Sequence, residues 1–436
     1  MSKNKTPLSS TKELVVSIIT QFYPPDYAAT GQLIQEVAVE LGKLGLSIHI
    51  FTGQPGYAFQ KQSAPGIENC DGVVIQRSRT TRIWSKRIRG KAINGILFCL
   101  RAALHLLKNS RDIDLLILTT APPFLPILGY FVNKIFHLPY ICLIYDLYPD
   151  VAVELNVIPH RHWLVRLWDG INCRIWQRAQ QVIVLSPSMK DRVLAKCPHI
   201  KHKIAVIHNW ADPNWIVPIA KGDNWFAQTF NLVDTFTVLY SGNMGRCHDM
   251  DTILEAAQIL QNEPIQFVFI GNGAKRKVFQ SQVNRIGLKN CQFLPYQEKQ
   301  NLPYSLTACD LSLVSISPSM EGLVAPSKFY TALAAGRPVA AICEPHSYLR
   351  EIVTDASCGE VFDNGDAIGL ANFIRRLSVN THLVKQMGEA GRLYLKSHFT
   401  LDLIAKQYWI LFDMSAPNQL TIKQSAVRSQ PSAKCL

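Results

Sequence analysis

The fold of this chain is decided by the stretch PSKFYTALAAGRP at residues 326–338, which predicts a short helix with a basic first turn. Ser327 can cap the start of this helix, Gly336 suits the left-handed residue after its end, and Pro338 prevents its continuation. Lys328 is the unusual residue, because a cation in the first turn faces the positive end of the helix dipole. A bound anion would reverse the sign of that interaction, so the helix start predicts a phosphate site. A surface lysine beside an ordinary helix start is the alternative interpretation.

Apolar, strand-like runs alternate with helical runs through most of the chain. The strand Val15–Thr20 precedes a helix over Gly31–Leu44, and the strand Phe236–Tyr240 precedes a helix over Asp251–Leu260. Continuous apolar strands with helical crossovers predict parallel sheets that are covered on both faces. Residues 209–234, with several Pro, Asp and Asn residues, interrupt the alternation and indicate a linker. The sequence therefore predicts an α/β protein of two Rossmann-like lobes with a cleft between them.

The predicted lobes divide the chain into two domains of similar kind. The 436 residues, of which 48% are hydrophobic, suffice for two such domains with large cores. We expect an N-terminal domain over residues 13–212 and a C-terminal domain over residues 233–399. An amphipathic helix at residues 400–414 follows and is expected to pack back on the first domain. Residues 415–436 are polar and lack periodicity, which predicts a disordered tail.

A glycine-containing loop, SGNMGR at residues 241–246, follows the first strand of the C-terminal half. Its glycines, Gly242 and Gly245, let the backbone approach a phosphate at a strand–helix junction, and Asn243 lies between them. Arg246 at its end can clamp an anion through two hydrogen bonds. Together with Lys328, this loop predicts a diphosphate site at the carboxyl edge of one sheet. A tight turn without a ligand explains such glycines equally well.

Four further loops hold candidate ligand-binding residues. Gly271 begins a Gly-Asn-Gly turn after the next strand, and Leu294 and Tyr296 follow another strand, where an aromatic ring can border a nucleobase. In the first half, Gly31 lies in a small, flexible helix start. Asp146 ends a strand, where a carboxylate can accept a proton or bind a hydroxyl group. A packing role for Tyr296 and a helix-capping role for Asp146 are the alternatives.

The net charge of +13 favours an anionic partner. An amphipathic stretch, residues 92–107, directly follows a basic run without acids, and this combination predicts peripheral contact with an anionic membrane through residues 77–107. A solvated loop before a core helix is the alternative. With no signal-peptide-like or spanning segment in the sequence, we expect a cytoplasmic protein at the inner face of the plasma membrane. The basic run consists of Arg77, Arg79, Arg82, Lys86, Arg87, Arg89 and Lys91.

Several other classes of site and partner are not indicated. The 11 cysteines form no C-x-x-C pair and the histidines are scattered, so we expect no metal site, no disulfide framework and no cofactor. The chain has no G-x-S-x-G nucleophile motif. Nucleic-acid binding is not expected, because the basic run contains a single aromatic residue, Trp84, and no nucleic-acid-binding module is visible.

With these loops in place, the chain resembles glycosyltransferase family 4, most closely the bacterial branch that builds capsule, O-antigen and exopolysaccharide chains. The resemblance covers about residues 15–414. It implies a GT-B fold, in which the C-terminal lobe binds a nucleotide sugar and the N-terminal lobe binds the acceptor. It also implies retention of anomeric configuration without a divalent metal ion. The motifs that carry it are YPP at 23–25, DLYP at 146–149, VLS at 184–186, YSGNMGR at 240–246, FIGNG at 269–273 and the opening stretch.

The resemblance also assigns roles to the candidate residues. It implies that Arg246 and Lys328 stabilise the departing diphosphate, while Gly271 and residues 294–296 border the base. Asp146 would orient the incoming hydroxyl group or accept its proton. Thr331 stands where many family members have a glutamate that binds the donor ribose, so a single hydroxyl contact replaces a carboxylate. Tyr145 stands where many members have a histidine.

The favoured hypothesis is a retaining, metal-independent glycosyltransferase in cell-surface polysaccharide synthesis. It would move a sugar from a nucleotide-diphosphate donor to a saccharide acceptor that is itself attached to a lipid. One alternative is a sugar-nucleotide epimerase on the same fold. Another is a degenerate, non-catalytic GT-B binding protein, which the threonine at position 331 motivates. The donor base, the sugar, the acceptor and the linkage stay open.

Overall fold

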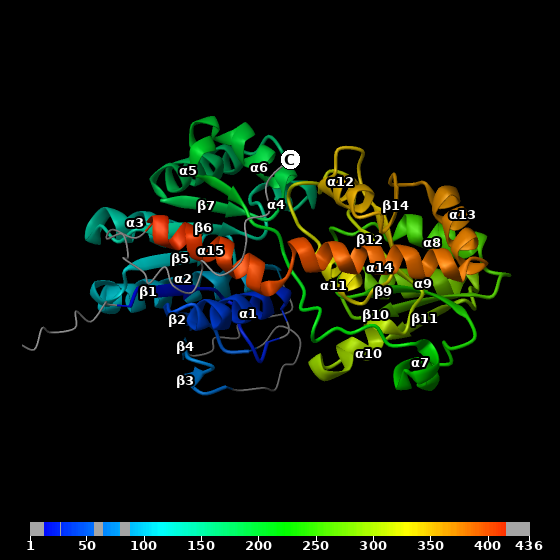
Figure 1. The fold of residues 1–436 in the computed structure, drawn as a ribbon. Helices are drawn as coiled ribbons and strands as arrows, with labels where there is room; N and C mark the ends of the chain where they lie inside the picture. Colours follow the sequence, from blue (N-terminus) through cyan, green and yellow to red (C-terminus); the bar gives the residue numbers. More distant parts are fainter. Residues whose placement is uncertain (1–12, 27, 56–63, 79–87, 416–436) are drawn as a thin grey trace, which may run out of the picture.

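The computed structural model describes residues 13–26, 28–55, 64–78 and 88–415. Most of the basic run and the tail at 416–436 lie outside these ranges. For Arg89 and Lys91 the backbone is described but the side chains are not. Two α/β lobes lie side by side, each with a central sheet flanked by helices (Figure 1). The predicted fold class of two Rossmann-like lobes is confirmed.

The N-terminal lobe is built on an eight-stranded sheet with the order β3-β4-β2-β1-β5-β6-β7-β8. All neighbouring strands pair in parallel except β3, which runs antiparallel to β4 at the edge. The strands are β1 (Val15–Ile19), β2 (Ser47–Thr52), β3 (Ile67–Cys70), β4 (Val73–Arg77), β5 (Leu115–Thr119), β6 (Tyr140–Ile144), β7 (Gln181–Val184) and β8 (Ile204–Val206).

Helices cover both faces of this sheet. Buried side chains of α2, α3 and α5 belong to one apolar cluster, whereas those of α1 and of the C-terminal helix α15 belong to a second. The two clusters therefore define two opposite helical layers. The helices are α1 (Ala29–Lys43), α2 (Ile88–Asn109), α3 (Ile127–Phe136), α4 (Asp150–Glu154), α5 (Trp163–Arg178), α6 (Pro187–Lys196) and α15 (Leu401–Ser415).

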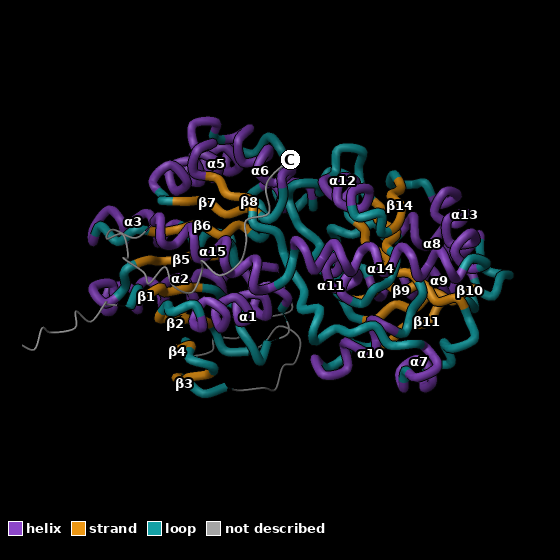
Figure 2. The backbone as a smooth tube through the Cα atoms, in the orientation of Figure 1, coloured by secondary structure: helices purple, strands orange, loops and turns teal. Residues whose placement is uncertain are grey.

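The C-terminal lobe has a six-stranded, fully parallel sheet with the order β11-β10-β9-β12-β13-β14. Figure 2 shows strands of this sheet with helices around them. Its strands are β9 (Phe236–Ser241), β10 (Ile265–Ile270), β11 (Cys291–Leu294), β12 (Leu311–Ser315), β13 (Val339–Ile342) and β14 (Gly359–Phe362). Its helices are α7 (Trp225–Thr229), α8 (Asp251–Ile259), α9 (Arg276–Ile286), α10 (Leu302–Thr307), α11 (Lys328–Ala334), α12 (Tyr348–Asp355), α13 (Ala367–Ser378) and α14 (Thr381–His398).

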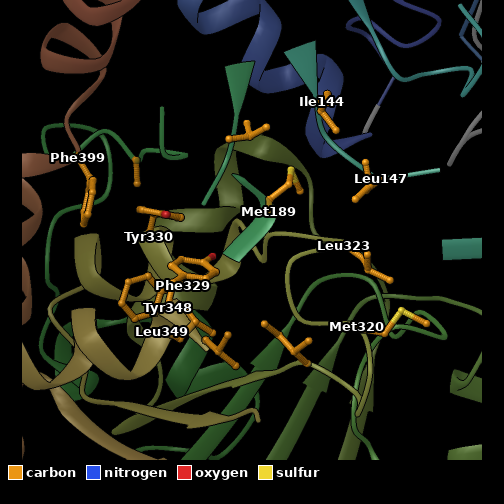
Figure 3. Packing of buried hydrophobic residues seen from close by; sticks show 14 of the residues in the cluster. Ile144, Leu147, Met189, Met320, Leu323, Phe329, Tyr330, Tyr348, Leu349 and Phe399 are labelled. Atoms are coloured by element: carbon orange, nitrogen blue, oxygen red, sulfur yellow. The ribbon is translucent and has the colours of Figure 1, made fainter. Parts of the chain in front are cut away.

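The two lobes share one continuous apolar cluster at their junction (Figure 3). Leu147 and Met189 from the N-terminal lobe belong to the same cluster as Met320 and Leu323 from the C-terminal lobe. The Leu147 N–H donates to the Leu323 carbonyl oxygen at 3.0 Å, so the loop after β6 is hydrogen-bonded to the loop after β12. These contacts fix the strand ends of one lobe against those of the other.

The opening stretch forms α11, with one correction to the predicted capping. Ser327 precedes the helix in an α-helical conformation and makes no side-chain cap, because its φ and ψ of −62° and −25° differ from the extended geometry that a capping residue adopts. Gly336 follows the helix with a φ of +63°, as predicted. Thus α11 ends as the sequence indicates but begins without the expected serine hydrogen bond.

Several elements were not predicted. The strand β3 is mostly exposed and lacks an apolar pattern, although the turn Asp71-Gly72, with φ of 52° and 79°, is a sequence signal for a hairpin. Helices α12 and α14 were missed as well. The predicted linker at 209–234 contains α7, which Asn224 caps by accepting hydrogen bonds from the Phe226 and Ala227 N–H groups.

We expect Gly388→Ala to destabilise the fold, because α14 crosses the end of α11 without room for a methyl group. A Cβ atom at Gly388 would come within 2.1 Å of the Gly336 carbonyl oxygen. Overpacking of this kind costs about 1–3 kcal/mol, measurable as a loss in the free energy of unfolding by urea titration. Gly42→Ala in α1 is the matched control, since a Cβ there meets nothing within 4 Å. Equal stability of the two variants would contradict this packing.

Candidate functional site

The centre of the candidate site is Lys328, whose side chain extends over the ring of Tyr240 at the end of β9. The Lys328 ammonium nitrogen lies 3.7 Å from the ring centroid, a cation–π contact, and also donates to the Tyr240 hydroxyl oxygen. Tyr240 is fully buried, and its hydroxyl donates to the Asn243 carbonyl oxygen at 3.0 Å. The lysine of α11 is thereby placed against the glycine loop after β9.

The ammonium group is buried without a carboxylate partner among the contacts of the described residues. Burial lowers the pKa of Lys328 well below its usual value of 10.5. Its neighbour His248 has a pKa lowered to about 3 by burial, by the charge of Lys328 and by Lys275. The His248 Nδ1–H group donates to the Ser315 carbonyl oxygen at 2.8 Å, which fixes a neutral tautomer. Such a pocket favours an incoming anion, because the anion would restore the protonated lysine.

Two glycine loops meet beside this lysine. The Gly242 N–H donates to the Ile270 carbonyl oxygen at 2.8 Å, and a Cβ at Gly242 would be 3.7 Å from the Lys328 Cε atom. Gly271 has a φ of +132°, and a Cβ there would come within 2.0 Å of the Gly242 carbonyl oxygen. The close backbone contact therefore accounts for the glycine at 271. Gly245 follows in the same loop, where a Cβ would meet the Asn243 side chain at 2.9 Å.

The residues expected to border the base and ribose surround the same sheet edge. Leu294 is buried at the end of β11, and the Tyr296 hydroxyl donates to the Asn272 carbonyl oxygen at 3.5 Å. The Thr331 hydroxyl donates back to the Lys328 carbonyl oxygen at 3.0 Å. A small pocket is lined by Thr331, Lys328 and Ser241, among others. Thr331 thus lies one helical turn from the ammonium group, on the same side of α11.

The predicted clamp of two cations is only half formed by direct contacts. Arg246 follows the glycine loop but is exposed, and no contact in the described residues joins it to Lys328. Lys275, which the sequence reasoning did not select, is hydrogen-bonded to this segment. Its ammonium group donates to the His248 carbonyl oxygen at 2.6 Å, and its N–H donates to the Met244 carbonyl oxygen at 2.9 Å. The sequence signal that could have identified Lys275 is its position four residues after Gly271, in the loop that follows β10.

Asp146 faces the C-terminal lobe from the loop after β6. Burial raises the pKa of its carboxyl group to about 6. The same carboxylate contributes, after burial, to raising the pKa of Cys247 to about 11, so the two side chains are electrostatic neighbours across the lobe boundary. The alternative capping role fails, because the residue before α4 is Pro149 and no side chain caps that helix. The acid is therefore directed toward the segment that holds Arg246.

Gly31 lies away from these contacts, inside the first turn of α1. It is buried, and a Cβ there would come within 2.9 Å of the Phe22 carbonyl carbon. Packing of the helix start against the preceding loop explains the glycine without a ligand. Its predicted role in substrate binding stays a prediction.

Glu321 is a buried acid that the sequence reasoning did not select. It is 1% exposed, and neither carboxylate oxygen has a hydrogen-bond partner among the described residues. Its carbonyl oxygen accepts from the Arg192 Nε–H group of the other lobe at 3.2 Å. An unpaired buried carboxylate at the lobe boundary is costly, and such groups concentrate at functional sites.

The sequence Asp249-Met250-Asp251 has the spacing of a D-x-D metal motif, but Asp249 is committed to local structure. Its carboxylate accepts from the Thr252 N–H group at 3.1 Å, from the Thr252 hydroxyl at 2.7 Å and from the Asn364 amide at 2.8 Å. Among the described residues, no group of three or more His, Cys, Asp and Glu side chains is placed to hold a metal ion.

Two family models together match most of the chain. The model of glycosyltransferase family 4 matches residues 30–215. The model of glycosyl transferases group 1 matches residues 222–394, which include the Lys328 site. The chain is a glycosyltransferase with a family 4 domain followed by a group 1 domain. This glycosyltransferase therefore carries its glycine loops and Lys328 within the matched C-terminal region.

Named relatives agree with this assignment. The glycosyltransferase is 27% identical to the probable glycosyltransferase WbjE of Pseudomonas aeruginosa over 68% of the chain and 73% of the relative. It is 28% identical to the putative colanic acid biosynthesis glycosyl transferase WcaI of Escherichia coli K12, over 39% of the chain and 42% of the relative.

Solved structures share the fold at low sequence identity. Sucrose-phosphate synthase from Thermosynechococcus elongatus superposes with a TM-score of 0.73 at 19% identity, over 92% of this chain and 99% of that one. Anabaena Alr3699/HepE, solved in complex with UDP and glucose, superposes with a TM-score of 0.70 at 15% identity, over 92% and 100% of the two chains. In the part of the chain that the structure describes, no helix is long and apolar enough to cross a membrane.

We expect Lys328→Met to stabilise the ligand-free protein by about 1–3 kcal/mol, because it removes a buried charge that has no carboxylate partner. Folding lowers the lysine pKa, so the unfolded chain binds more protons between the lowered value and 10.5, and native stability rises with pH there. The variant should lose that rise. Urea unfolding at several pH values measures both effects.

The matched control is Lys277→Met on the exposed side of α9, which should change the free energy of unfolding by no more than about 0.5 kcal/mol. A Lys328→Met protein less stable than the native one would show that the ammonium group is better solvated than its contacts indicate.

Proposed function

We propose that this glycosyltransferase binds the diphosphate of a nucleotide-sugar donor at Lys328 and transfers the sugar to a saccharide acceptor. The observation that carries the proposal is the buried ammonium group over Tyr240, beside the glycine loop after β9. The relation to HepE, which is solved with UDP and glucose, supports a nucleotide-sugar donor. The name of WcaI supports a role in polysaccharide synthesis.

The chemistry follows from where negative charge develops. As the bond between the sugar and the diphosphate breaks, the leaving oxygens gain charge, and a cation in a dry pocket stabilises that charge more than it stabilises the bound donor. Lys328 is fixed in place by Tyr240, so little reorganisation is needed. Arg246 and Lys275 lie on segments beside the pocket and would contact the outer phosphate oxygens. The proposed reaction retains anomeric configuration and uses these cations in place of a divalent metal ion.

The acceptor is proposed to enter from the N-terminal lobe. Asp146 faces the segment of Cys247 and can orient the acceptor hydroxyl or take its proton, since its pKa of about 6 leaves it ionised at neutral pH. The proposed acceptor is attached to a lipid and lies at an anionic membrane, which residues 77–107 contact. Family membership favours this transferase over the epimerase and the non-catalytic binding protein.

A thermal-shift screen against UDP, GDP and ADP sugars tests the donor site. We expect one base to raise the melting temperature of the native protein, because a ligand that binds only the folded state stabilises it. The Lys328→Met variant should lose this shift, and its turnover should fall by about 10²–10³-fold.

The reaction proposed here should continue in EDTA and give a product with the donor's anomeric configuration, which NMR of the product resolves. Full turnover in Lys328→Met, or loss of turnover in EDTA, would refute the corresponding part of the proposal.

Turnover should fall as pH drops through about 6, because protonation of Asp146 removes the carboxylate that contacts the acceptor hydroxyl. Asp146→Asn should lower turnover by about a hundredfold or more and abolish this acidic limb of the pH profile. Donor binding, measured by thermal shift, should stay unchanged in the same variant. An acidic limb that persists in Asp146→Asn would assign it to another group.

A further inference from the structure

Large apolar side chains are exposed on three helices of the N-terminal lobe. Phe131 and Ile135 on α3 are 50% and 62% exposed, and Trp163 at the start of α5 is 65% exposed. Residues 131 and 135 are one turn apart, so they share one side of their helix. We call the following seven residues the three-helix surface: Leu100, Leu104 and Leu107 of α2, Phe131 and Ile135 of α3, and Trp163 and Leu167 of α5.

The three helices form one layer, so these side chains lie on the same side of the lobe. The buried faces of α2, α3 and α5 pack into the same apolar cluster, and α3 contacts both of its neighbours. Arg178 of α5 further joins the two helices, because its Nε–H group donates to the Asn133 side chain at 2.6 Å and its guanidinium lies 5.8 Å from the Tyr130 ring centroid. The exposed apolar residues therefore lie on one layer of packed helices.

The charges around these apolar residues are almost all positive. The sequences of α2, α3 and α5 contain a single acid, Asp169, which pairs with Lys196 at 2.5 Å. Exposed cations stand among the apolar side chains, namely Lys108, Lys134, Arg166, Arg174 and Arg178. An apolar layer with a basic rim is the composition that binds the headgroup region of an anionic bilayer.

A groove beside α2 extends the basic rim. It is lined by Arg101, Lys108 and Asn109 together with Leu104 of the three-helix surface. His105 in the same groove stacks on Phe51 and has a pKa lowered to about 4 by burial, so it adds no charge at neutral pH. The groove therefore places the exposed Lys108 next to the apolar side chain of Leu104, which matches a lipid phosphate above its acyl chains.

We propose that the three-helix surface docks on an anionic lipid bilayer, with Phe131, Ile135 and Trp163 inserted at the boundary between headgroups and acyl chains. A second copy of the chain is a poorer partner, because two identical basic rims would repel each other. This extends the membrane contact proposed for residues 77–107 to α3 and α5. The purpose of the contact, access to an acceptor attached to a lipid, rests on the proposed function. Tryptophan suits the insertion, since its indole ring combines an apolar body with a polar N–H group.

The surface is connected directly to the acceptor side of the site. Asn172 of α5 donates to the Tyr148 carbonyl oxygen at 2.7 Å, two residues after Asp146. The Tyr148 and Trp168 rings are stacked with centroids 6.2 Å apart. Helix α5 therefore lies between the proposed bilayer and the loop of the acceptor carboxylate, so an acceptor anchored in that bilayer would reach Asp146 along a short path.

Vesicle sedimentation tests this surface without any donor or acceptor. The full chain should bind vesicles of phosphatidylcholine mixed with phosphatidylglycerol and bind pure phosphatidylcholine weakly. The triple variant Phe131→Ser, Ile135→Ser, Trp163→Ser should lower the partition coefficient by about tenfold or more. The matched control is Ile368→Ser with Leu393→Ser, which removes equally exposed apolar groups (69% and 67%) from the other lobe and should bind as the native chain does.

Three outcomes would overturn the proposal. The triple variant could bind the mixed vesicles as well as the native protein. Alternatively, only the variant Arg87→Gln, Arg89→Gln, Lys91→Gln could lose binding. Thirdly, light scattering could show that the native protein is a dimer and that the triple variant is a monomer. Circular dichroism melting checks that each variant is folded. Because no sugar nucleotide is present, failure of the donor proposal leaves this result interpretable, and the reverse also holds.

Discussion

The burial of one ammonium group on the ring of Tyr240 is the constraint around which the C-terminal lobe is arranged. The ring comes from a central strand, and the lysine comes from a helix 88 residues later in the chain. Their contact requires α11 to lie close to the strand ends, where Gly336 and Gly388 allow α14 to cross without a side chain between them. Burying the charge lowers the stability of the ligand-free protein, but it leaves a site that is ready to bind an anion.

The same region also fixes the relation of the lobes. The loop after β12, which carries Glu321 and Leu323, precedes α11 and contacts the N-terminal lobe through two main-chain acceptors. A change in the position of α11 would therefore alter the hydrogen bonds at the lobe boundary. The proposed donor site and the proposed acceptor site would therefore be linked through a few consecutive residues of this loop.

The sequence predicted the repeating elements well and the side-chain partners poorly. The alternating strands and helices and the left-handed Gly336 follow from local rules. Tyr240 was not selected, because in a buried strand an aromatic residue is indistinguishable from a core residue. Arg246 was selected and Lys275 was not, because the direction in which a loop side chain points is not visible in a sequence.

Helix α15 has a consequence for the order in which the protein can be completed. Its residues Ile404, Ala405, Tyr408 and Phe412 fill the core of the N-terminal lobe against α1, although they are among the last residues of the described chain. During translation the first lobe is synthesised well before α15. Until α15 is made, the apolar face that it covers beside α1 stays exposed. The N-terminal lobe is therefore completed only after the C-terminal lobe has been synthesised, which makes the assembly of the first lobe depend on the synthesis of the second.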